Sequence, residues 1–303
     1  IMKNGDAAYQ LTHLSKCSEI IRQKVQDRIN GQSLVVSNYW EELLTKSLKQ
    51  ESTTVSDDRE QKARQEKIAC LLRIAASRFS VLIGPAGTGK TTLLTVLASH
   101  PEIKDNGVLL LAPTGKARVR MEEIAKGLDM TASTLAQFLK GYHRYNGSQR
   151  RYVMSNERAT NYDTVILDEA SMLTEEMLAT TLDCLQHAKR FILVGDHRQL
   201  PPIGAGRPFV DIVNYLKPEG IESHFPRIST GYAELTIKMR QGGSKREDIQ
   251  LAEWFSGETL EPGADQIIND ILSKKKNDYL RLVSWETESD FEKVLEEVIT
   301  EEL

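Results

Sequence analysis

The segment GPAGTGKT at residues 84–91 has the residue types and spacing of a phosphate-binding loop. It follows the apolar stretch SVLIG and precedes LLTVLASH, so it has the strand–loop–helix context that such a loop needs. Glycines let backbone N–H groups turn toward phosphate oxygens, Lys90 brings positive charge to the β- and γ-phosphates, and the Thr91 hydroxyl can ligate Mg²⁺. We therefore predict a nucleoside triphosphate site formed by Gly84, Pro85, Ala86, Gly87, Thr88, Gly89, Lys90, Thr91 and Thr92.

An acidic pair, Asp168 and Glu169, ends the apolar stretch in VILDEAS (165–171). In an open α/β sheet, ligands bind at the carboxyl ends of the strands, where this pair would lie. We expect Asp168 to hold Mg²⁺ together with Thr91, and Glu169 to orient and deprotonate an attacking water. The alternative is an acidic pair that only caps a helix, and the upstream phosphate loop disfavours it.

The segment GDHRQLPPIGAGRPF (195–209) follows another apolar stretch, FILVGD. Gln199, just after this predicted strand, is expected to sense the γ-phosphate and to relay its state to neighbouring loops. The alternative is a loop of proline, glycine and solvated polar residues that has no catalytic role.

The elements that must position these residues follow from the apolar pattern. Short apolar stretches alternate with helical stretches from residue 80 onward, which predicts an α/β fold whose parallel sheet is covered on both faces. Residues 11–50 have helical apolar spacing and end in a polar linker. Farther along we expect strands at 235–237 and 280–285, a helix near 246–256 and a final amphipathic helix. These last elements cannot bury their apolar faces alone, so we expect a domain that is cut short.

Composition limits the compartment and the partners. The 303-residue chain has a net charge of −4, but residues 286–303 contain eight acidic residues and one lysine, which leaves residues 1–285 with a charge of +3. The acidic total therefore does not exclude nucleic-acid binding. The three widely spaced cysteines predict a reducing, cytoplasmic setting without a structural zinc site. No apolar run is long enough for a membrane helix, and we expect no membrane partner.

Four segments, in this order, resemble motifs I, Ia, II and III of superfamily 1 helicases: GPAGTGKTT, LLLAPTGKA, VILDEASML and FILVGDHRQLPPIG. They are most similar to the RecD-like branch, which is related to the alpha subunit of exodeoxyribonuclease V, although Pro85 stands where these proteins usually carry a second glycine. The resemblance implies a RecA-like P-loop NTPase. Its parts would be a helical N-terminal segment (1–58), a first RecA-like domain 1A (59–234) with a small β-hairpin 1B insertion near 140–160, and the truncated start of a second RecA-like domain 2A (235–303).

The resemblance also implies roles around the nucleotide. Gln65 resembles the glutamine that hydrogen-bonds adenine, with Gln61 as a nearby competitor. Arg240 resembles the arginine by which the second domain reaches the γ-phosphate and stabilises transition-state charge, although a lone arginine after a strand is often only a surface charge. Motifs V and VI are absent before Leu303, so we expect this chain to bind nucleotide, to hydrolyse it poorly and not to unwind DNA.

On the DNA side, Thr114 resembles the motif Ia residue that contacts a phosphate, and Ser133 and Thr134 resemble motif Ib. The segment YHRYNGSQRRY (142–152) lies where the family inserts its hairpin, and Asn146-Gly147 predicts a type I′ turn between strands at 142–145 and 148–153. Tyrosines can stack on unpaired bases and arginines can neutralise phosphates, so this arm is predicted to project and to contact DNA through Tyr142, Arg144, Tyr145, Arg150, Arg151 and Tyr152. The alternative is an exposed hairpin without a ligand.

The resemblance therefore implies an ATP- and Mg²⁺-dependent DNA helicase or translocase that moves 5′→3′ on single-stranded DNA and takes part in recombination or repair. Residues 1–58 are either a surface for other repair or recombination subunits or the end of a larger N-terminal domain. One rival is a nucleotide-switched binding or signalling module, whose turnover would not depend on DNA and which leaves the hairpin unexplained. The other is a small-molecule kinase, which should lack the GDxxQLPP segment and carry an arginine-rich lid.

Overall fold

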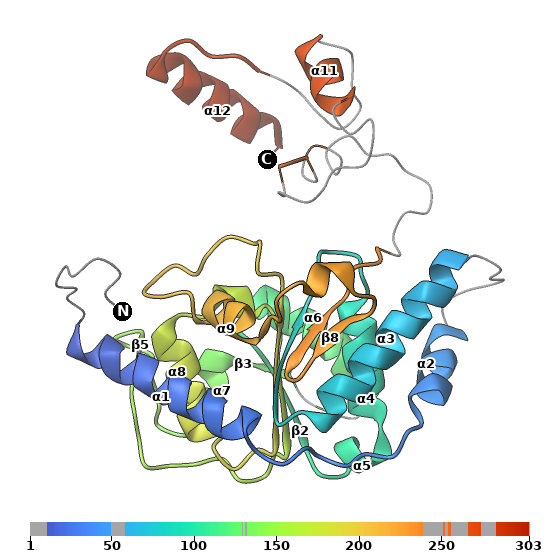
Figure 1. Ribbon diagram of the computed structural model, residues 1–303. Coiled ribbons are helices and arrows are strands. Elements are labelled where there is room, and N and C mark those ends of the chain that lie inside the picture. Colours follow the sequence, from blue (N-terminus) through green and yellow to red (C-terminus); the bar gives the residue numbers. More distant parts are fainter. Residues whose placement is uncertain are drawn as a thin grey trace. The chain divides into compact units, whose positions relative to one another are not determined.

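The computed structural model describes residues 11–49, 58–128, 130, 132–238, 251, 254–255, 266–273 and 283–302. The chain divides into two units, Ile1–Arg240 and Gln241–Leu303 (Figure 1). The first unit contains the sheet, and it also contains the helices of the predicted N-terminal segment. The predicted start of the second RecA-like domain, residue 235, lies within the last residues of this first unit.

The first unit is built on a seven-stranded sheet with the order β3-β2-β6-β7-β1-β9-β8. All neighbouring strands are parallel except β8 and β9, which are antiparallel. The predicted α/β fold with a parallel sheet is confirmed. The strands are β1 (Phe79–Ile83), β2 (Val108–Ala112), β3 (Ala132–Thr134), β6 (Thr164–Leu167), β7 (Arg190–Gly195), β8 (Arg227–Ser229) and β9 (Tyr232–Glu234).

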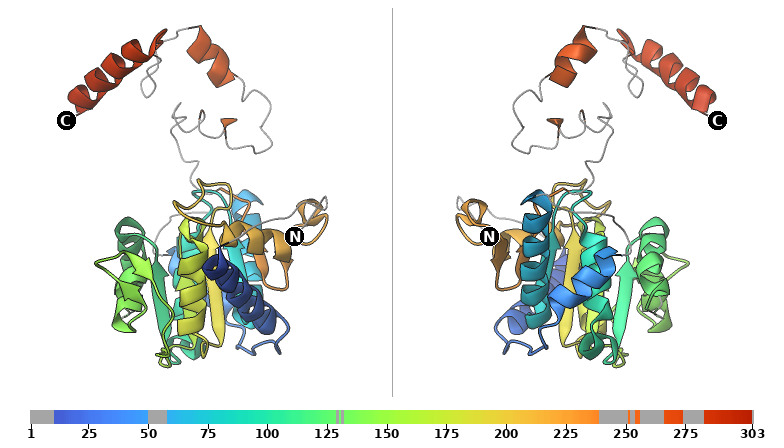
Figure 2. Two further views of the ribbon diagram at one scale, coloured as in Figure 1. Left: turned by 90° about the vertical axis from the view of Figure 1, so that its left-hand side faces the viewer. Right: turned by 90° about the vertical axis from the view of Figure 1, so that its right-hand side faces the viewer.

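Helices cover both faces of this sheet, which Figure 2 shows from the side. Every residue of β1, β2, β6 and β7 is buried, because neither face of these strands meets water. One face is covered by α1 (Thr12–Ile29), α7 (Leu135–Gly141), α8 (Glu175–Cys184) and α9 (Pro208–Leu216). The other is covered by α2 (Trp40–Lys49), α3 (Asp58–Ala76), α4 (Lys90–Ser99), α5 (Pro101–Lys104) and α6 (Gly115–Lys126).

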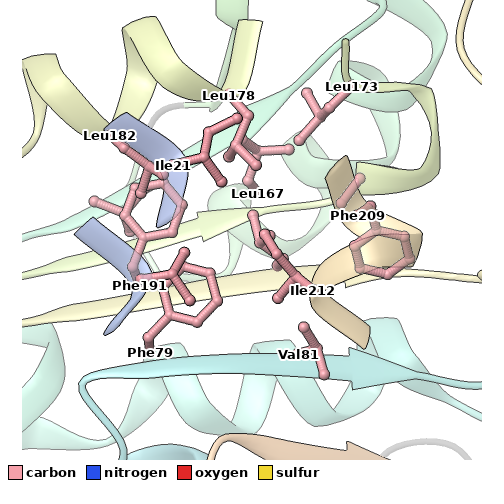
Figure 3. Packing of buried hydrophobic residues seen from close by; sticks show 14 of the residues in the cluster. Ile21, Phe79, Val81, Leu167, Leu173, Leu178, Leu182, Phe191, Phe209 and Ile212 are labelled. Carbon is pink, nitrogen blue, oxygen red and sulfur yellow. The ribbon is translucent and has the colours of Figure 1, made fainter. Parts of the chain in front are cut away.

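The N-terminal helix α1 is part of the core. Its Ile21 packs in one cluster with Leu178 and Leu182 of α8, beside the stacked rings of Phe79 and Phe191, whose centroids are 5.9 Å apart (Figure 3). The α1 helix buries Cys17, Ile21 and Val25 on this face. Removing residues 11–29 would therefore expose apolar surface of the first unit itself.

Two strand predictions in the C-terminal part are wrong. The strand expected at 235–237 lies at Tyr232–Glu234, and residues 235–238 have no regular structure. Residues 283–285 are not a strand, and 280–282 lie outside the described residues. Most of the helix expected near 246–256 also lies outside them, although residues 251 and 254 are helical.

The second unit contains the helices α11 (Gln266–Leu272) and α12 (Glu288–Glu302) among its described residues. The predicted final amphipathic helix is α12, and its apolar residues Phe291, Leu295, Val298 and Ile299 are exposed. In the described part of the chain, no helix has both the length and the apolar character that a membrane crossing requires.

Candidate nucleotide site and nucleic-acid interface

The phosphate loop connects the end of β1 at Ile83 to the start of α4 at Lys90. Gly87 and Gly89 have φ angles of 83° and 88°, in the left-handed region that glycine tolerates best. A Cβ at position 89 would also lie only 3.1 Å from Cε of Lys67. The loop conformation therefore requires glycine where it turns into the helix, and the N–H groups of the first turn of α4 are available to an anion.

Lys90 lies inside this loop. Its Nζ donates to the carbonyl oxygens of Gly84 at 2.5 Å and Pro85 at 3.1 Å. Burial lowers the pKa of Lys90, and the charges of Asp196, Asp168 and Glu169 act in the opposite direction. Three carboxylates thus lie close enough to act on this lysine, while burial and the positive charge of Arg120 outweigh them.

The acidic pair follows β6, as predicted. Burial raises the pKa of Asp168, and the Glu169 charge adds to this effect, while the backbone N–H of Glu169 and the cations Lys90 and Arg120 oppose it. The N–H of Glu169 donates to Oδ1 of Asp168 at 2.9 Å. Glu169 itself has φ 52° and ψ 40°, a left-handed conformation that is rare outside glycine and is characteristic of functional sites.

The oxygen atoms around the phosphate loop suit Mg²⁺. Thr91 lies exposed in the first turn of α4, and Asp168 lies at the carboxyl end of β6, across the same edge of the sheet. Among the described residues, no group of three or more His, Cys, Asp or Glu side chains could hold a metal without other ligands. Mg²⁺ typically takes one or two protein oxygens and completes its coordination with phosphates and water, which this pair matches.

Gln199 lies next to the segment that carries the acidic pair. Its Oε1 accepts a hydrogen bond from Ser171 Oγ at 3.3 Å, two residues after Glu169. At the end of β7, a Cβ on Gly195 would lie 3.3 Å from the backbone nitrogen of Ala170. The segment after β7 is therefore packed against the segment after β6, which is the contact that a relay between them needs.

Helix α3 brings two residues to the site that the sequence did not single out. Lys67 is buried with its Nζ against Gly89, and Glu66 is buried with its carboxylate on Thr236, whose N–H and hydroxyl donate at 2.8 and 2.5 Å. Ala63, Glu66, Lys67 and Cys70 share the buried side of α3, a helical spacing that could have revealed them. Gln65 and Gln61 are exposed on the same helix, and the adenine contact predicted for Gln65 stays a prediction. Arg240 lies outside the described residues.

The predicted DNA-phosphate contacts lie at two helix N-termini. Thr114 caps α6, accepting from the N–H of Ala117 at 3.2 Å, and Thr134 caps α7 in a capping box with Gln137. The strands that precede them are paired in register, with Ala112 opposite Thr134, so both caps lie at one edge of the sheet. Ser133 precedes the second cap and is half-buried. Two adjacent helix N-termini form a surface that attracts anions.

The predicted hairpin exists, but its turn differs from the prediction. Its strands are β4 (Tyr145–Asn146) and β5 (Arg151–Tyr152), and residues 147–150 connect them. Asn146 Oδ1 accepts from the backbone N–H groups of Ser148 at 3.1 Å and Gln149 at 3.2 Å. The prediction of a type I′ turn at Asn146-Gly147 is therefore wrong. The asparagine side chain instead organises a longer turn, in which Arg150 takes the positive φ angle of 50°.

The prediction that Arg144 contacts DNA is also wrong. The Arg144 side chain is completely buried, donates to Asp183 Oδ2 at 2.8 Å and to the Glu157 carbonyl at 3.0 Å, and also bonds the Ser155 carbonyl. Its role is to hold the segment after the hairpin against α8, which carries Asp183. The physical reason is that the hairpin lies along α7 and α8, so the side chain that follows α7 points into the fold.

The three tyrosines of the hairpin are half-buried. Tyr145 and Tyr152 face each other across the two strands with centroids 4.9 Å apart, and Tyr142 lies against Phe138 at 5.1 Å. All three pack against the core cluster, and burial raises the pKa of Tyr152 to about 12. Of the six residues predicted to contact DNA from this arm, Arg150 and Arg151 are exposed, so they are the accessible candidates.

Comparisons with known proteins show what this chain is similar to. A family model described as "AAA domain" matches residues 60–253. An uncharacterised protein of Methanocaldococcus jannaschii is 32% identical over 187 residues, covering 58% of this chain and 16% of that protein. The ATP-dependent RecD2 DNA helicase of Deinococcus radiodurans is 35% identical over 146 residues, covering 48% of this chain and 19% of the helicase. The match thus spans less than a fifth of either relative. A crystal structure of Pif1 helicase from Bacteroides in complex with ADP-AlF3 and ssDNA is 19% identical, with a TM-score of 0.44 over 83% of this chain and 58% of that one.

Proposed function

The chain belongs to the AAA domain family, and from this premise we propose that it is the ATP-hydrolysing part of a DNA helicase or translocase that moves on single-stranded DNA. The predicted resemblance to RecD-like superfamily 1 helicases is confirmed by the match to the RecD2 helicase. The observation that supports the proposal is what lies at one edge of the sheet. The phosphate loop, the acidic pair and the two capped helix N-termini all follow the carboxyl ends of its parallel strands.

The residues at this edge have separate roles in phosphoryl transfer to water. Lys90 and the N–H groups of α4 bind the phosphates, and Thr91 and Asp168 hold Mg²⁺. Bound Mg²⁺ would neutralise charge on the β- and γ-phosphates. Glu169 orients the attacking water and accepts its proton. Gln199, bonded to Ser171, senses the γ-phosphate and passes its state along the segment after β7.

The remaining parts of the proposal concern the substrate and the setting. Thr114 and Thr134 contact the DNA backbone, because a helix N-terminus with a hydroxyl cap suits a phosphate. Movement in the 5′→3′ direction and a role in recombination or repair follow the RecD-like resemblance. A cytoplasmic location follows from the three scattered cysteines, and residues 1–58 are proposed to contact other subunits. Polarity is tested by unwinding of duplexes that carry either a 5′ or a 3′ single-stranded tail.

The deciding experiment is steady-state ATP hydrolysis by the longest natural chain that contains these residues, with and without a single-stranded oligonucleotide. We expect strong stimulation by the oligonucleotide and loss of turnover in Lys90→Ala, while Lys104→Ala, an exposed lysine on α5, behaves as wild type. Turnover that requires Lys90 but ignores DNA would favour a nucleotide-switched binding module instead. Turnover unchanged in Lys90→Ala would refute the proposed nucleotide site.

A further inference from the structure

Glu169, whose side chain is proposed to activate water, forms an ion pair with a cation from another element. Glu169 Oε1 accepts from Nη1 of Arg120 at 2.8 Å, and the two residues are 49 positions apart in the chain. Arg120 lies in the second turn of α6, the helix whose first residue follows the cap Thr114. The ion pair therefore connects the candidate general base to the helix proposed to bind DNA.

This ion pair opposes the proposed role of Glu169. A general base must direct a carboxylate oxygen at the water whose proton it takes. The guanidinium instead occupies Oε1 and orients the carboxylate toward α6. While the ion pair is formed, Oε1 of Glu169 is bonded to Arg120 and the carboxylate is held in one orientation. The fraction of molecules that have the base in position is therefore smaller than it would be without the pair.

Arg120 is placed to exchange one anion for another. Its side chain is 57% exposed, whereas that of Glu169 is 19% exposed, so solvent and ligands reach the pair from the Arg120 side. Six residues along a helix correspond to about 9 Å, which places Arg120 within side-chain reach of a strand held at Thr114. Guanidinium groups bind phosphate oxygens strongly and in a bidentate manner, so a DNA phosphate competes directly with the carboxylate for Arg120.

We propose that Arg120 is a positioning residue that restrains Glu169 until single-stranded nucleic acid binds along α6, and that transfer of Arg120 to a phosphate releases the base. This inference rests on the proposed function and adds to it a physical cause for stimulation of ATP hydrolysis by DNA. No movement of the core is needed, because a single exposed side chain changes its partner. The ligand is the sugar–phosphate backbone, so the effect is independent of base sequence.

The test compares Arg120→Ala with Arg118→Ala in the longest natural chain that contains these residues. Arg118 lies on the same helix but forms its ion pair with Glu122 of that helix, so it is a matched control. A pair of this exposure biases an equilibrium by about 1.5- to 5-fold, so we expect Arg120→Ala to raise the DNA-free kcat by about that factor. The DNA-saturated kcat and the KM for ATP should stay unchanged, the stimulation ratio should fall by the same factor, and Arg118→Ala should match wild type. Arg120→Lys, which keeps a cation, should be intermediate.

The outcomes separate the two proposals. If DNA stimulates wild type and Arg120→Ala leaves the DNA-free kcat unchanged or lowers it, the restraint is refuted while the helicase proposal stands. A lowered kcat would mean that Arg120 assists the reaction directly. If wild type is not stimulated by DNA at all, the proposed function fails and the restraint fails with it. When Arg120→Ala is combined with Glu169→Gln, the increase in the DNA-free kcat should disappear, because that increase acts through Glu169.

Discussion

Substitution of Arg144 is the sharpest test of the corrected hairpin. In the structure this arginine is 0% exposed, and its partner Asp183 is 18% exposed. Arg144→Ala removes the cation from a buried ion pair and leaves the carbonyl oxygens of Ser155 and Glu157 without its hydrogen bonds. Breaking a fully buried pair from one side typically costs about 3–5 kcal/mol, and the charge that remains here, on Asp183, is partly exposed.

The expected value lies at the low end of that range. Arg158 also lies 3.3 Å from Asp183 and donates to the same two carbonyl groups, so part of the network survives. We therefore expect the free energy of unfolding to fall by about 3 kcal/mol. With a urea dependence of about 2–3 kcal/mol per M, the unfolding midpoint should shift down by about 1–1.5 M.

The assay is urea unfolding followed by circular dichroism, beside Arg151→Ala as the control. Arg151 is exposed on the same hairpin, so its removal should change the free energy of unfolding by less than about 0.5 kcal/mol. Arg151→Ala should instead weaken binding of single-stranded DNA and reduce its salt dependence. Wild-type stability of Arg144→Ala together with weakened DNA binding would refute the structural role and restore the original prediction.

Three further outcomes are expected. Gly89→Ala should abolish nucleotide binding in a fluorescent-nucleotide titration, because φ is 88° and the new Cβ would meet Lys67; wild-type affinity would contradict the loop geometry. Glu66→Ala should lower the free energy of unfolding by about 2–3 kcal/mol in urea, since it leaves donors of Thr236 unpaired, whereas exposed Gln65→Ala should not. The folded chain should resist a thiol reagent at pH 8 and react fully in denaturant, because burial is the main cause that raises the pKa of Cys17, Cys70 and Cys184 and the unreactive thiol form persists to higher pH.

The parts of the fold that the sequence predicted are those in which every residue of an element has the same environment. The strands β1, β2, β6 and β7 are buried on both faces, so they appear as unbroken apolar runs. The phosphate loop was predictable for a related reason, since its glycines and lysine are required by local backbone geometry. Neither feature depends on a distant partner.

The strand β9 was missed because its burial depends on partners. Tyr232 and Glu234 are buried in a strand that lies between β1 and the edge strand β8, and the Tyr232 hydroxyl donates to Oε2 of Glu234 at 2.8 Å. Arg227 of β8 donates to the other carboxylate oxygen at 2.9 Å. The sequence does not distinguish a buried carboxylate from an exposed one. The strand was therefore predicted at residues 235–237 (LTI), which follow β9.

The hairpin shows the same limit for a charged surface motif. Its tyrosines and arginines were all assigned to DNA from composition, but composition does not say which side of the arm faces α7 and α8. Arg144 lies three residues after the end of α7 and is buried, whereas Arg150 lies in the turn and Arg151 directly after it, and both are exposed. Position relative to the turn therefore separates the structural arginine from the accessible ones.

Helix α3 explains how the phosphate loop and the end of the first unit are held together. Lys67 lies against Gly89 of the loop, and its neighbour Glu66 binds Thr236, just after the last strand of the sheet. Arg59, near the start of the same helix, donates to the carbonyl of Lys238 at 3.0 Å. Because a helix is rigid over such a short distance, these contacts set the position of residues 236–238 relative to the loop. Sequence motifs describe the loop alone, whereas this arrangement arises from one helix that contacts both.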